Sequence, residues 1–367
     1  MSRAQALAWR LDRHLLGVIG STSVTDVVGA LCGVQAQVPS TAELAVRVRS
    51  KAMPAGAVDK ALARGDIVRT WAMRGTLHLL TPDAAGTFLA LIAAARPWEA
   101  RAWSNWFGLT PAVIEAMRDA AHEALAAGPM AREDLIEALV SRPGLGHVGT
   151  PLRESWGTAF KPLAWQGVLA FGPMRDGRPT FVRPDRVSPS WPGLADAEDA
   201  GPRAVAAYLS AHGPATVERF QRWLGRANKR QVKAWWEAAG ERLARVEVDG
   251  EAAHVLARDL DALLASRPSR AVRLLPGFDQ WIMGRGTDDP RTVPPARRAA
   301  VSRQAGRISP VVLVAGVVCG TWSADRNLLR IEWFAEAGRV PEAALAREVA
   351  RVCAILARPP AFDFVTV

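Results

Sequence analysis

Between residues 200 and 256, apolar residues recur first at helical spacing and then at every second position. Gly213 ends the first of three helical stretches, and Thr216 and Asn228 are suited to cap the second and the third. Two alternating stretches, LARVEV and AAHVLA, then flank Asp249-Gly250, a dipeptide typical of a tight hairpin turn. Three helices followed by a hairpin predict a winged helix, a relative of the helix-turn-helix fold.

The same plan is present in residues 101–195. VIEAMRDAAHEALAAG and REDLIEALV predict two helices, and a third helical stretch runs from Leu152 to Gln166 with an interruption at Pro162. GVLAFGPMRDGRPTFVR then reads as a hairpin that turns at Asp176-Gly177. We therefore expect a second winged helix here.

A short stretch of similar letters supports this repeat. AAGPMAREDL at 126–135 corresponds to AHGPATVERF at 211–220, and in both a Gly-Pro pair ends one helix before a polar run opens the next. Residues 1–100 form a looser copy, in which three helical stretches precede a hairpin across Arg74-Gly75. The pattern as a whole predicts three winged-helix units in tandem.

The pattern changes beyond residue 270. Four strand-like stretches follow, and a long Pro-, Gly- and Arg-rich loop between the first two precedes a final helix, PEAALAREVARVCAIL. We predict an α+β fold with three tandem winged-helix units followed by a β-rich, barrel-like region. The predicted boundaries are 1–100, 101–195, 196–268 and 269–367.

Composition adds a hint of a polyanionic partner. The 367 residues have a formal charge of +10, and 49% are apolar and 22% charged, which is typical of a globular chain. The basic excess is mostly Arg, whose planar guanidinium binds phosphate in a bidentate manner. Arg- and Ala-rich chains also arise in GC-rich genomes, so charge alone leaves the partner open. The 14 tryptophans are expected mainly in the core.

The sequence favours a cytoplasmic protein without metal or cofactor. Cys32, Cys319 and Cys353 are far apart, odd in number and form no CxxC pair, so neither a disulfide framework nor a zinc site is supported. The charged N-terminus has no apolar core of the kind that signal peptides contain. No stretch approaches the roughly 20 apolar residues of a membrane span.

Four motifs in order carry a family resemblance. LCGVQAQVPS, TWAMRGTLHLLTPDA, LLPGFDQWIMG and ISPVVLVAGVVCGTW together resemble the AlkZ-type winged-helix DNA glycosylases, a family that includes a glycosylase for azinomycin interstrand crosslinks. The resemblance covers nearly the whole chain. It implies three winged helices, a β-rich C-terminal part and a catalytic Gln-x-Gln motif on Gln35 and Gln37. A sister branch has Gln-x-Asp, so this chain resembles the branch for crosslinks and bulky adducts.

The chemistry of Gln35 and Gln37 is coherent with that role. Glutamine does not titrate, but it can hold a water by accepting one hydrogen bond and donating another. This suffices when the leaving group is already activated, as in a purine that carries a positive charge after alkylation at N7. Without the resemblance, two glutamines at this spacing are more often surface or helix-end polar residues.

Further residues are candidates for contact with substrate or DNA. His78 is either a core histidine or a residue lining the site, and Asp279 in GFDQW is expected to order a loop. Basic residues near helix starts and in the long loop are either phosphate contacts or solvated side chains. The basic candidates are Arg74, Lys229, Arg230, Arg285, Arg291, Arg297, Arg298, Arg303 and Arg307. Arg226 and Lys233 lie close in sequence to Lys229 and Arg230 and are further basic residues of that region.

We therefore expect a monofunctional DNA glycosylase that hydrolyses the N-glycosidic bond of bulky or crosslinked N7-alkylated purines. Its role would be repair of, or self-resistance to, a DNA-alkylating natural product. Double-stranded DNA with such lesions is the expected partner, no membrane is involved, and the chain acts as a monomer. The alternative is a non-catalytic winged-helix DNA-binding protein, either a regulator or a drug-sequestering resistance protein.

Overall fold

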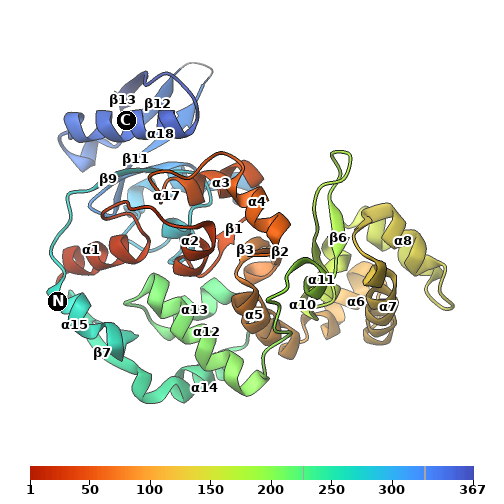
Figure 1. The fold of residues 1–367 in the computed structure, drawn as a ribbon. Coiled ribbons are helices and arrows are strands. Elements are labelled where there is room, and N and C mark those ends of the chain that lie inside the picture. Colours follow the sequence, from red (N-terminus) through yellow and green to blue (C-terminus); the bar gives the residue numbers. More distant parts are fainter. Residues whose placement is uncertain (226, 326–327) are drawn as a thin grey trace. The chain divides into compact units, whose positions relative to one another are not determined.

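The structure of the protein, a computed structural model, describes residues 1–225, 227–325 and 328–367. The chain contains both helices and short strands (Figure 1), in agreement with the predicted α+β class. The chain divides into two compact units. Unit 1 contains Met1–Ala57, Ala206–Trp223 and Gly240–Val367, and unit 2 contains Val58–Val205 and Leu224–Ala239.

Unit 2 is built around short antiparallel strands in the order β3-β2-β5-β6-β4. Its strands are β2 (Val68–Trp71), β3 (Leu77–Leu80), β4 (Met130–Ala131), β5 (Ala170–Phe171) and β6 (Thr180–Val182). Its helices are α4 (Ala57–Arg64), α5 (Pro82–Ala94), α6 (Arg101–Phe107), α7 (Pro111–Ala124), α8 (Arg132–Val140), α9 (Gly149–Glu154), α10 (Lys161–Trp165), α11 (Pro184–Val187) and α14 (Lys229–Ala239). Helix α12 (Ala197–His212) runs from unit 2 into unit 1.

The helical stretch predicted around Pro162 is divided differently. Helix α9 ends at Glu154, Gly157 has a φ of +83°, and α10 begins at Lys161 with Pro162 in its first turn. Proline is tolerated there because the first N–H groups of a helix have no intrahelical acceptor. Pro162 therefore helps to start a helix and does not interrupt one.

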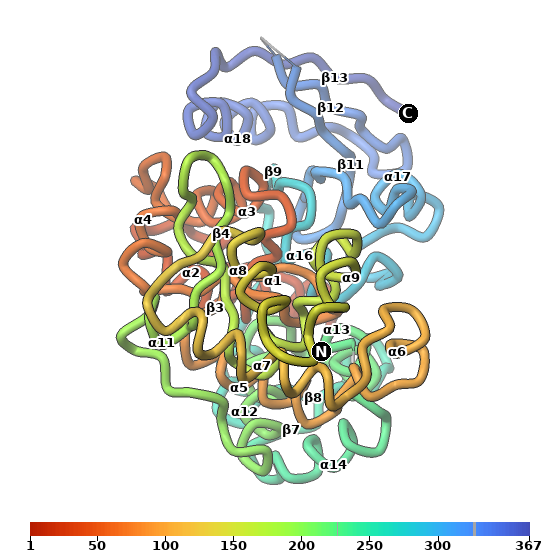
Figure 2. Tube along the Cα trace, turned by 90° about the vertical axis from the view of Figure 1, so that its right-hand side faces the viewer, coloured from red at the N-terminus to blue at the C-terminus, as the bar shows by residue number. Residues whose placement is uncertain are grey.

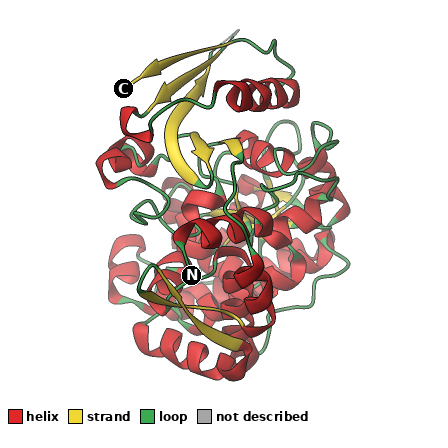
Figure 3. Cartoon of the chain, turned by 90° about the vertical axis from the view of Figure 1, so that its left-hand side faces the viewer, coloured by secondary structure: helices red, strands yellow, loops and turns green. Residues whose placement is uncertain are grey.

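In unit 1, two of the local signals predicted between residues 200 and 256 are confirmed, the cap at Thr216 and the turn at Asp249-Gly250. Thr216 Oγ1 accepts a hydrogen bond from the Arg219 N–H at the start of α13 (Val217–Leu224). Strands β7 (Leu243–Val248) and β8 (Glu251–Leu256) pair across Asp249-Gly250, whose φ angles are +49° and +83°. Figure 3 shows the N-terminus beside this hairpin, where the Met1 ammonium donates to the Glu247 carbonyl at 2.8 Å.

The C-terminal region forms an open sheet, and the predicted barrel-like closure is absent from the described residues. The strand order is β13-β12-β11-β10-β9, so β9 and β13 form opposite edges. Strand β13 was not predicted, and it pairs in parallel with β12. The strands are β9 (Val272–Leu275), β10 (Val311–Val314), β11 (Val317–Ala324), β12 (Leu329–Trp333) and β13 (Phe362–Thr366).

Helix α18 (Glu342–Ile355) packs against this sheet (Figure 2). Its buried face, with Leu345, Val349 and Val352, joins the main hydrophobic core of unit 1, which also takes Leu7 and Leu11 from the N-terminal helix. The remaining elements of unit 1 are α1 (Arg3–Arg13), α2 (Val24–Ala30), β1 (Val34–Gln35), α3 (Pro39–Arg47), α15 (Leu260–Ala265), α16 (Gln280–Met283) and α17 (Arg298–Val301).

Candidate functional site

The Gln-x-Gln motif lies in unit 1, in the segment that links α2 to α3. Helix α2 ends in a reversal at Cys32 and Gly33, where φ is +56° and +99°, and the chain then enters the two-residue strand β1. Gln35 is the last residue of β1. Gln37 follows in a bend, two residues before Pro39 begins α3. The motif is therefore held between two helices of the same unit.

The two glutamines differ in burial. Gln35 is 5% exposed, and its Oε1 has no hydrogen-bond partner among the described residues. Gln37 is exposed. An i, i+2 pair on a continuous strand would share one face, but β1 ends at Gln35 and the bend separates the two environments. Gln35 therefore presents a buried amide oxygen that can still accept a hydrogen bond, and Gln37 presents its amide at the surface.

The start of α3 lies close to Gln37 in the sequence. Val38 occupies the N-cap position and gives no side-chain hydrogen bond to the first turn. Pro39 has no N–H, and the N–H groups of Thr41 and Ala42 donate to the Val38 carbonyl at 3.1 and 3.2 Å. In this first turn only the Ser40 N–H is left for an outside acceptor, so the start of α3 offers an anion at most one backbone donor.

Arg74 and His78 lie in unit 2, on the β2–β3 hairpin. Arg74 adopts a φ of +56° at the turn, and the backbone around Gly225 lies against it, so that a Cβ at Gly225 would stand 3.1 Å from the Arg74 Cα. Gly225 is four residues before Lys229 begins α14. Unit 2 therefore brings the hairpin turn close to the chain segment that leads into α14.

His78 is completely buried and neutral near pH 7. Its Nδ1 donates to the Thr76 carbonyl at 3.0 Å, and its Nε2 is buried without a partner among the described residues. Burial, and then the nearby positive charge of Arg74, lower the pKa of His78 to about 3. The ring therefore offers a lone pair on Nε2, as a hydrogen-bond acceptor, without carrying a proton.

The basic candidates near α14 are exposed. Lys229 and Arg230 form its first two residues, and Lys233 forms an exposed ion pair with Glu237 at 3.6 Å. Arg226 lies outside the described residues. The predicted cap of α14 is confirmed, since Asn228 Oδ1 accepts from the Gln231 N–H at 2.8 Å.

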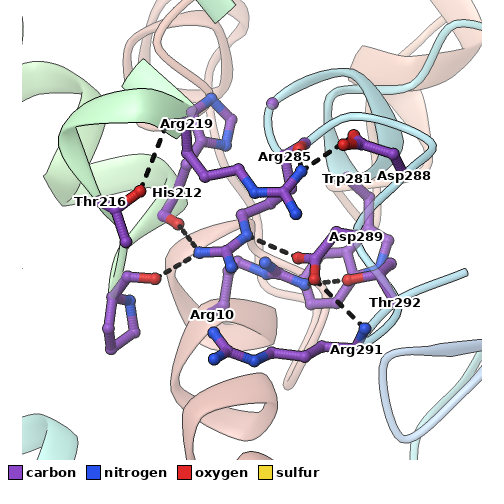
Figure 4. A network of polar contacts seen from close by, with 12 residues as sticks. Arg10, His212, Thr216, Arg219, Trp281, Arg285, Asp288, Asp289, Arg291 and Thr292 are labelled. Carbon is purple, nitrogen blue, oxygen red and sulfur yellow. Dashed lines mark hydrogen bonds and ion pairs between the residues drawn. The ribbon is translucent and has the colours of Figure 1, made fainter. Parts of the chain in front are cut away.

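Half of the arginines in the basic loop are committed to partners within the protein. Arg285 is 6% exposed, and its Nε donates to Asp289 at 2.7 Å while its Nη1 donates to the carbonyls of His212 and Pro214 (Figure 4). Arg291 forms an ion pair with Glu251, and Arg297 donates to Glu336 at 2.7 and 2.8 Å. Arg285 and Arg297 each use two guanidinium nitrogens on fixed partners, so we leave these two out of the proposed DNA contacts. Arg291 uses only its Nη2, on the exposed Glu251, and can still donate to a further acceptor.

The other three loop arginines are exposed. Arg298 begins α17, and Arg303 and Arg307 follow it, joined by a backbone hydrogen bond from the Arg303 N–H to the Arg307 carbonyl at 2.8 Å. These side chains remain available as phosphate contacts on unit 1.

Sequence reasoning missed two buried arginines, Arg10 and Arg49. Arg10 follows buried Leu7 by three positions on α1, a spacing that marks the inner face of a helix. Arg49 forms a bidentate ion pair with Asp279, with both distances 2.8 Å and both side chains fully buried. Asp279 also accepts from the Trp281 N–H at 2.8 Å, which confirms that it orders the loop entering α16.

Two structural findings concern metals and membranes. Within the described ranges, no three His, Cys, Asp or Glu side chains gather in a way that could hold a metal ion. Across the same residues, no helix is both long enough and apolar enough to cross a bilayer. The absence of metal and cofactor from the reaction, and the cytoplasmic location, stay predictions.

Comparison with known proteins places this geometry in a family. The chain is 39% identical over 351 residues to a protein of Streptomyces sahachiroi named interstrand DNA cross-link repair glycosylase, covering 95% of both chains. The structure of the present chain matches that of Streptomyces sahachiroi DNA glycosylase AlkZ with a TM-score of 0.96, at 38% sequence identity and over the full length of both chains. The family described as DNA glycosylase AlkZ-like matches residues 28–355. The chain therefore belongs to the AlkZ-like DNA glycosylase family, whose members are enzymes that hydrolyse N-glycosyl bonds.

Proposed function

We propose that this protein excises bulky or crosslinked N7-alkylated purines from double-stranded DNA, with Gln35 and Gln37 as the catalytic pair. The name of the Streptomyces sahachiroi relative, an interstrand cross-link repair glycosylase, supports the lesion class. The Gln-x-Gln motif supports the mechanism. A role in repair or in self-resistance to an alkylating natural product follows from the same lesion class.

The mechanism rests on one observation: Gln35 is buried and its Oε1 has no partner among the described residues, whereas Gln37 is exposed. A buried amide oxygen without a donor costs free energy, about 1–3 kcal/mol, unless a partner arrives. We assign that partner to the reaction, as the water that attacks C1′ or as a donor group of the substrate. Exposed Gln37 would then contact the lesion nucleotide directly, and Gln35 would hold the water or orient the site from within.

The leaving group supplies the driving force that the glutamines lack. Neither amide ionises near neutral pH, so neither gives strong base catalysis, which is typically worth about 10²- to 10⁴-fold. A purine alkylated at N7 is positively charged, which weakens its bond to C1′. Attack by water leaves an intact abasic site and forms no Schiff base with lysine.

The DNA contacts that we propose are exposed or lie beside the α14 segment. They comprise Lys229 and Arg230 at the start of α14, Arg74 at the hairpin turn, and Arg298, Arg303 and Arg307 in the basic loop. His78 stays a candidate for substrate contact within unit 2, where its buried Nε2 is a hydrogen-bond acceptor. The helices and hairpins of residues 1–268 are proposed to act as three tandem winged-helix units, in which the hairpins and third helices approach the duplex.

The test measures single-turnover release of N7-methylguanine and unhooking of a defined N7-crosslinked duplex. Gln37→Ala and Gln35→Ala are expected to lower the excision rate by about 10²-fold or more, the scale of a lost transition-state hydrogen bond, while DNA affinity stays nearly constant. Uracil should be released far more slowly than N7-methylguanine, and borohydride should trap no complex.

The matched control is Gln304→Ala, an exposed glutamine amide in the basic loop, which should keep the full rate. Wild-type rates in both motif variants, or a trapped covalent complex, would contradict the mechanism. Tight binding of alkylated DNA without any base release would instead identify a non-catalytic DNA-binding protein.

A further inference from the structure

Four arginines line a small cavity in unit 1. Its volume is about 20 Å³, and Arg3 and Arg10 of α1 line it together with Arg285 and Arg291. The wall is completed by Ala6 and Leu7 of α1, the Gly213-Pro214 segment, and Val248 at the end of β7. A space of this size admits one water molecule or one oxygen atom of a larger group. We call this cavity the arginine pocket.

The pocket carries an excess of positive charge. Arg285 pairs with Asp289 at 2.7 Å, and Arg291 pairs with Glu251, so two of the four guanidinium groups are balanced by carboxylates. In the part of the chain that the structure describes, the guanidinium groups of Arg3 and Arg10 form no ion pair, although the Asp249 carboxylate accepts from the Arg3 backbone N–H at 3.0 Å. The four guanidinium groups outnumber the carboxylates beside them, and this local excess of positive charge favours an anion.

Arg10 is the most constrained of the four. It is 3% exposed, its Nη2 donates to Thr292 Oγ1 at 2.8 Å, and its guanidinium carbon lies 4.3 Å from the centre of the Trp281 ring. Its Nε is buried and has no acceptor in the described residues. Burial, and then the charge of Arg285, lower its pKa to about 9. A buried cation with an unused donor is costly, and an added anion would relieve that cost.

The pocket is held in shape before any ligand arrives. Asp289 accepts from the Arg285 Nε and, through its other oxygen, from the Arg291 N–H at 3.2 Å. Arg285 also donates to the carbonyls of His212 and Pro214. Figure 4 shows Arg10, Arg285 and Arg291 lying around Asp289. A binding site whose groups are already ordered loses little entropy when it is filled.

We propose that the arginine pocket binds a tetrahedral oxyanion of the phosphate or sulfate type, with one oxygen inside the cavity. Arg3 and Arg291, which are only partly buried, hold the remaining oxygens at the mouth. The source is either a phosphate of the DNA backbone or free inorganic anion. Binding of a free anion is independent of the proposed glycosylase activity. Binding of a DNA phosphate rests on the proposed function, because that function makes DNA the substrate.

The first experiment follows thermal unfolding of the protein in inorganic phosphate against chloride at equal ionic strength, without DNA. At a phosphate concentration ten times the dissociation constant, the ratio of folded to unfolded protein should rise about elevenfold. Arg3→Gln and Arg291→Gln should abolish the saturable part of this rise. Arg347→Gln, an exposed arginine on α18, is the matched control and should leave it intact.

The second experiment identifies the source by measuring how the affinity for undamaged duplex depends on salt. If the ligand is a DNA phosphate, Arg3→Gln and Arg291→Gln should each make the slope of log K against log salt shallower by about 0.9, and Arg347→Gln should not. Phosphate stabilisation with unchanged slopes would identify a free anion. An effect in neither experiment would overturn the proposal and leave the pocket to water, whatever the excision assay shows.

Discussion

The buried and the exposed arginines of unit 1 make different kinds of contact. Arg49 lies in the core with Asp279 and two backbone carbonyls as partners, whereas Arg298 stands on the surface. A guanidinium removed from water needs acceptors for its donors, so its partners are built into the fold. An exposed guanidinium is solvated, and its binding capacity remains for a ligand. Counting the arginines in a sequence therefore does not separate those that stabilise the fold from those that can bind a ligand.

The largest effect should come from breaking the buried pair. Arg49→Met leaves the Asp279 carboxylate buried without its counterion and should lower the free energy of unfolding by about 3–5 kcal/mol, as measured by urea denaturation. The double variant Arg49→Met with Asp279→Asn should lose less than the sum of the single changes, because the unpaired charge is gone.

Arg347→Gln provides the exposed comparison for the same measurement. A surface substitution of this kind should change stability by no more than about 0.5 kcal/mol. If Arg49→Met were as mild as Arg347→Gln, the buried pair would not stabilise the fold in the way that its geometry indicates.

Buried His78 in unit 2 extends the contrast to acid stability. Its pKa is lowered from 6.5 to about 3, so below pH 6.5 the unfolded chain takes up a proton that the folded chain does not. Folding stability should therefore fall as the pH decreases from 6.5 towards 3, with the His78 contribution reaching about 2 kcal/mol at pH 5.

His78→Asn keeps an N–H near the position of Nδ1, which donates to Thr76, but cannot titrate. Denaturation curves at pH 7 and pH 5 should differ less for this variant than for the wild type, even if the variant is less stable at both. An equal pH dependence for the two proteins would show that His78 is not held neutral.

Local parts of the fold were predictable from sequence because local chemistry decides them. Thr216, Asn228 and Asp249-Gly250 act through neighbours a few residues away, and all three signals are confirmed. The open C-terminal sheet was not predictable in the same way. Strand β13 reaches β12 only after α18 intervenes, with Leu329 opposite Phe362, and no local pattern encodes such a pairing.

The candidate site was likewise predictable only in its local features. The spacing of Gln35 and Gln37 and their family resemblance are visible in the letters, but the burial of one and the exposure of the other are not. The loop arginines look alike in sequence as well. Arg297 and Arg298 are neighbours, yet the first is paired with Glu336 across 39 positions and the second is exposed. Partners that are distant in sequence decide which arginine is available.

The neighbours Arg297 and Arg298 allow a more specific test, with a smaller expected effect, of which arginines contact DNA. If the protein neutralises about five phosphates, log K for duplex DNA should fall with log salt at a slope of about −4 to −5. Arg298→Gln should make the slope shallower by about 0.9, the value for one lost phosphate contact. Arg297→Gln should leave the slope unchanged because its guanidinium is already bound to Glu336 and to the Val367 carbonyl.

The salt titration would be read by fluorescence anisotropy between 50 and 200 mM, the range over which several phosphate contacts change affinity strongly. Arg303→Gln and Arg307→Gln test the rest of the exposed group. Equal slopes for Arg297→Gln and Arg298→Gln would remove exposure as the criterion for DNA contact. A slope near zero in the wild type would remove the phosphate backbone from recognition altogether.

The smallest expected effect is that of chelation. We expect protein cations, and not a bound divalent ion, to neutralise the DNA phosphates. The lesion itself brings the charge that weakens the glycosidic bond, so the proposed reaction gives a Lewis acid no necessary task. Excision in EDTA should then equal excision without it. Added Mg²⁺ should only weaken DNA binding, since it competes with arginine for the same phosphates. Loss of turnover in EDTA that a divalent ion restores would mean that a metal bridges the protein to DNA or activates the water. The exposed arginines would then not be the principal phosphate contacts, and the roles of Gln35 and Gln37 would have to be reassigned.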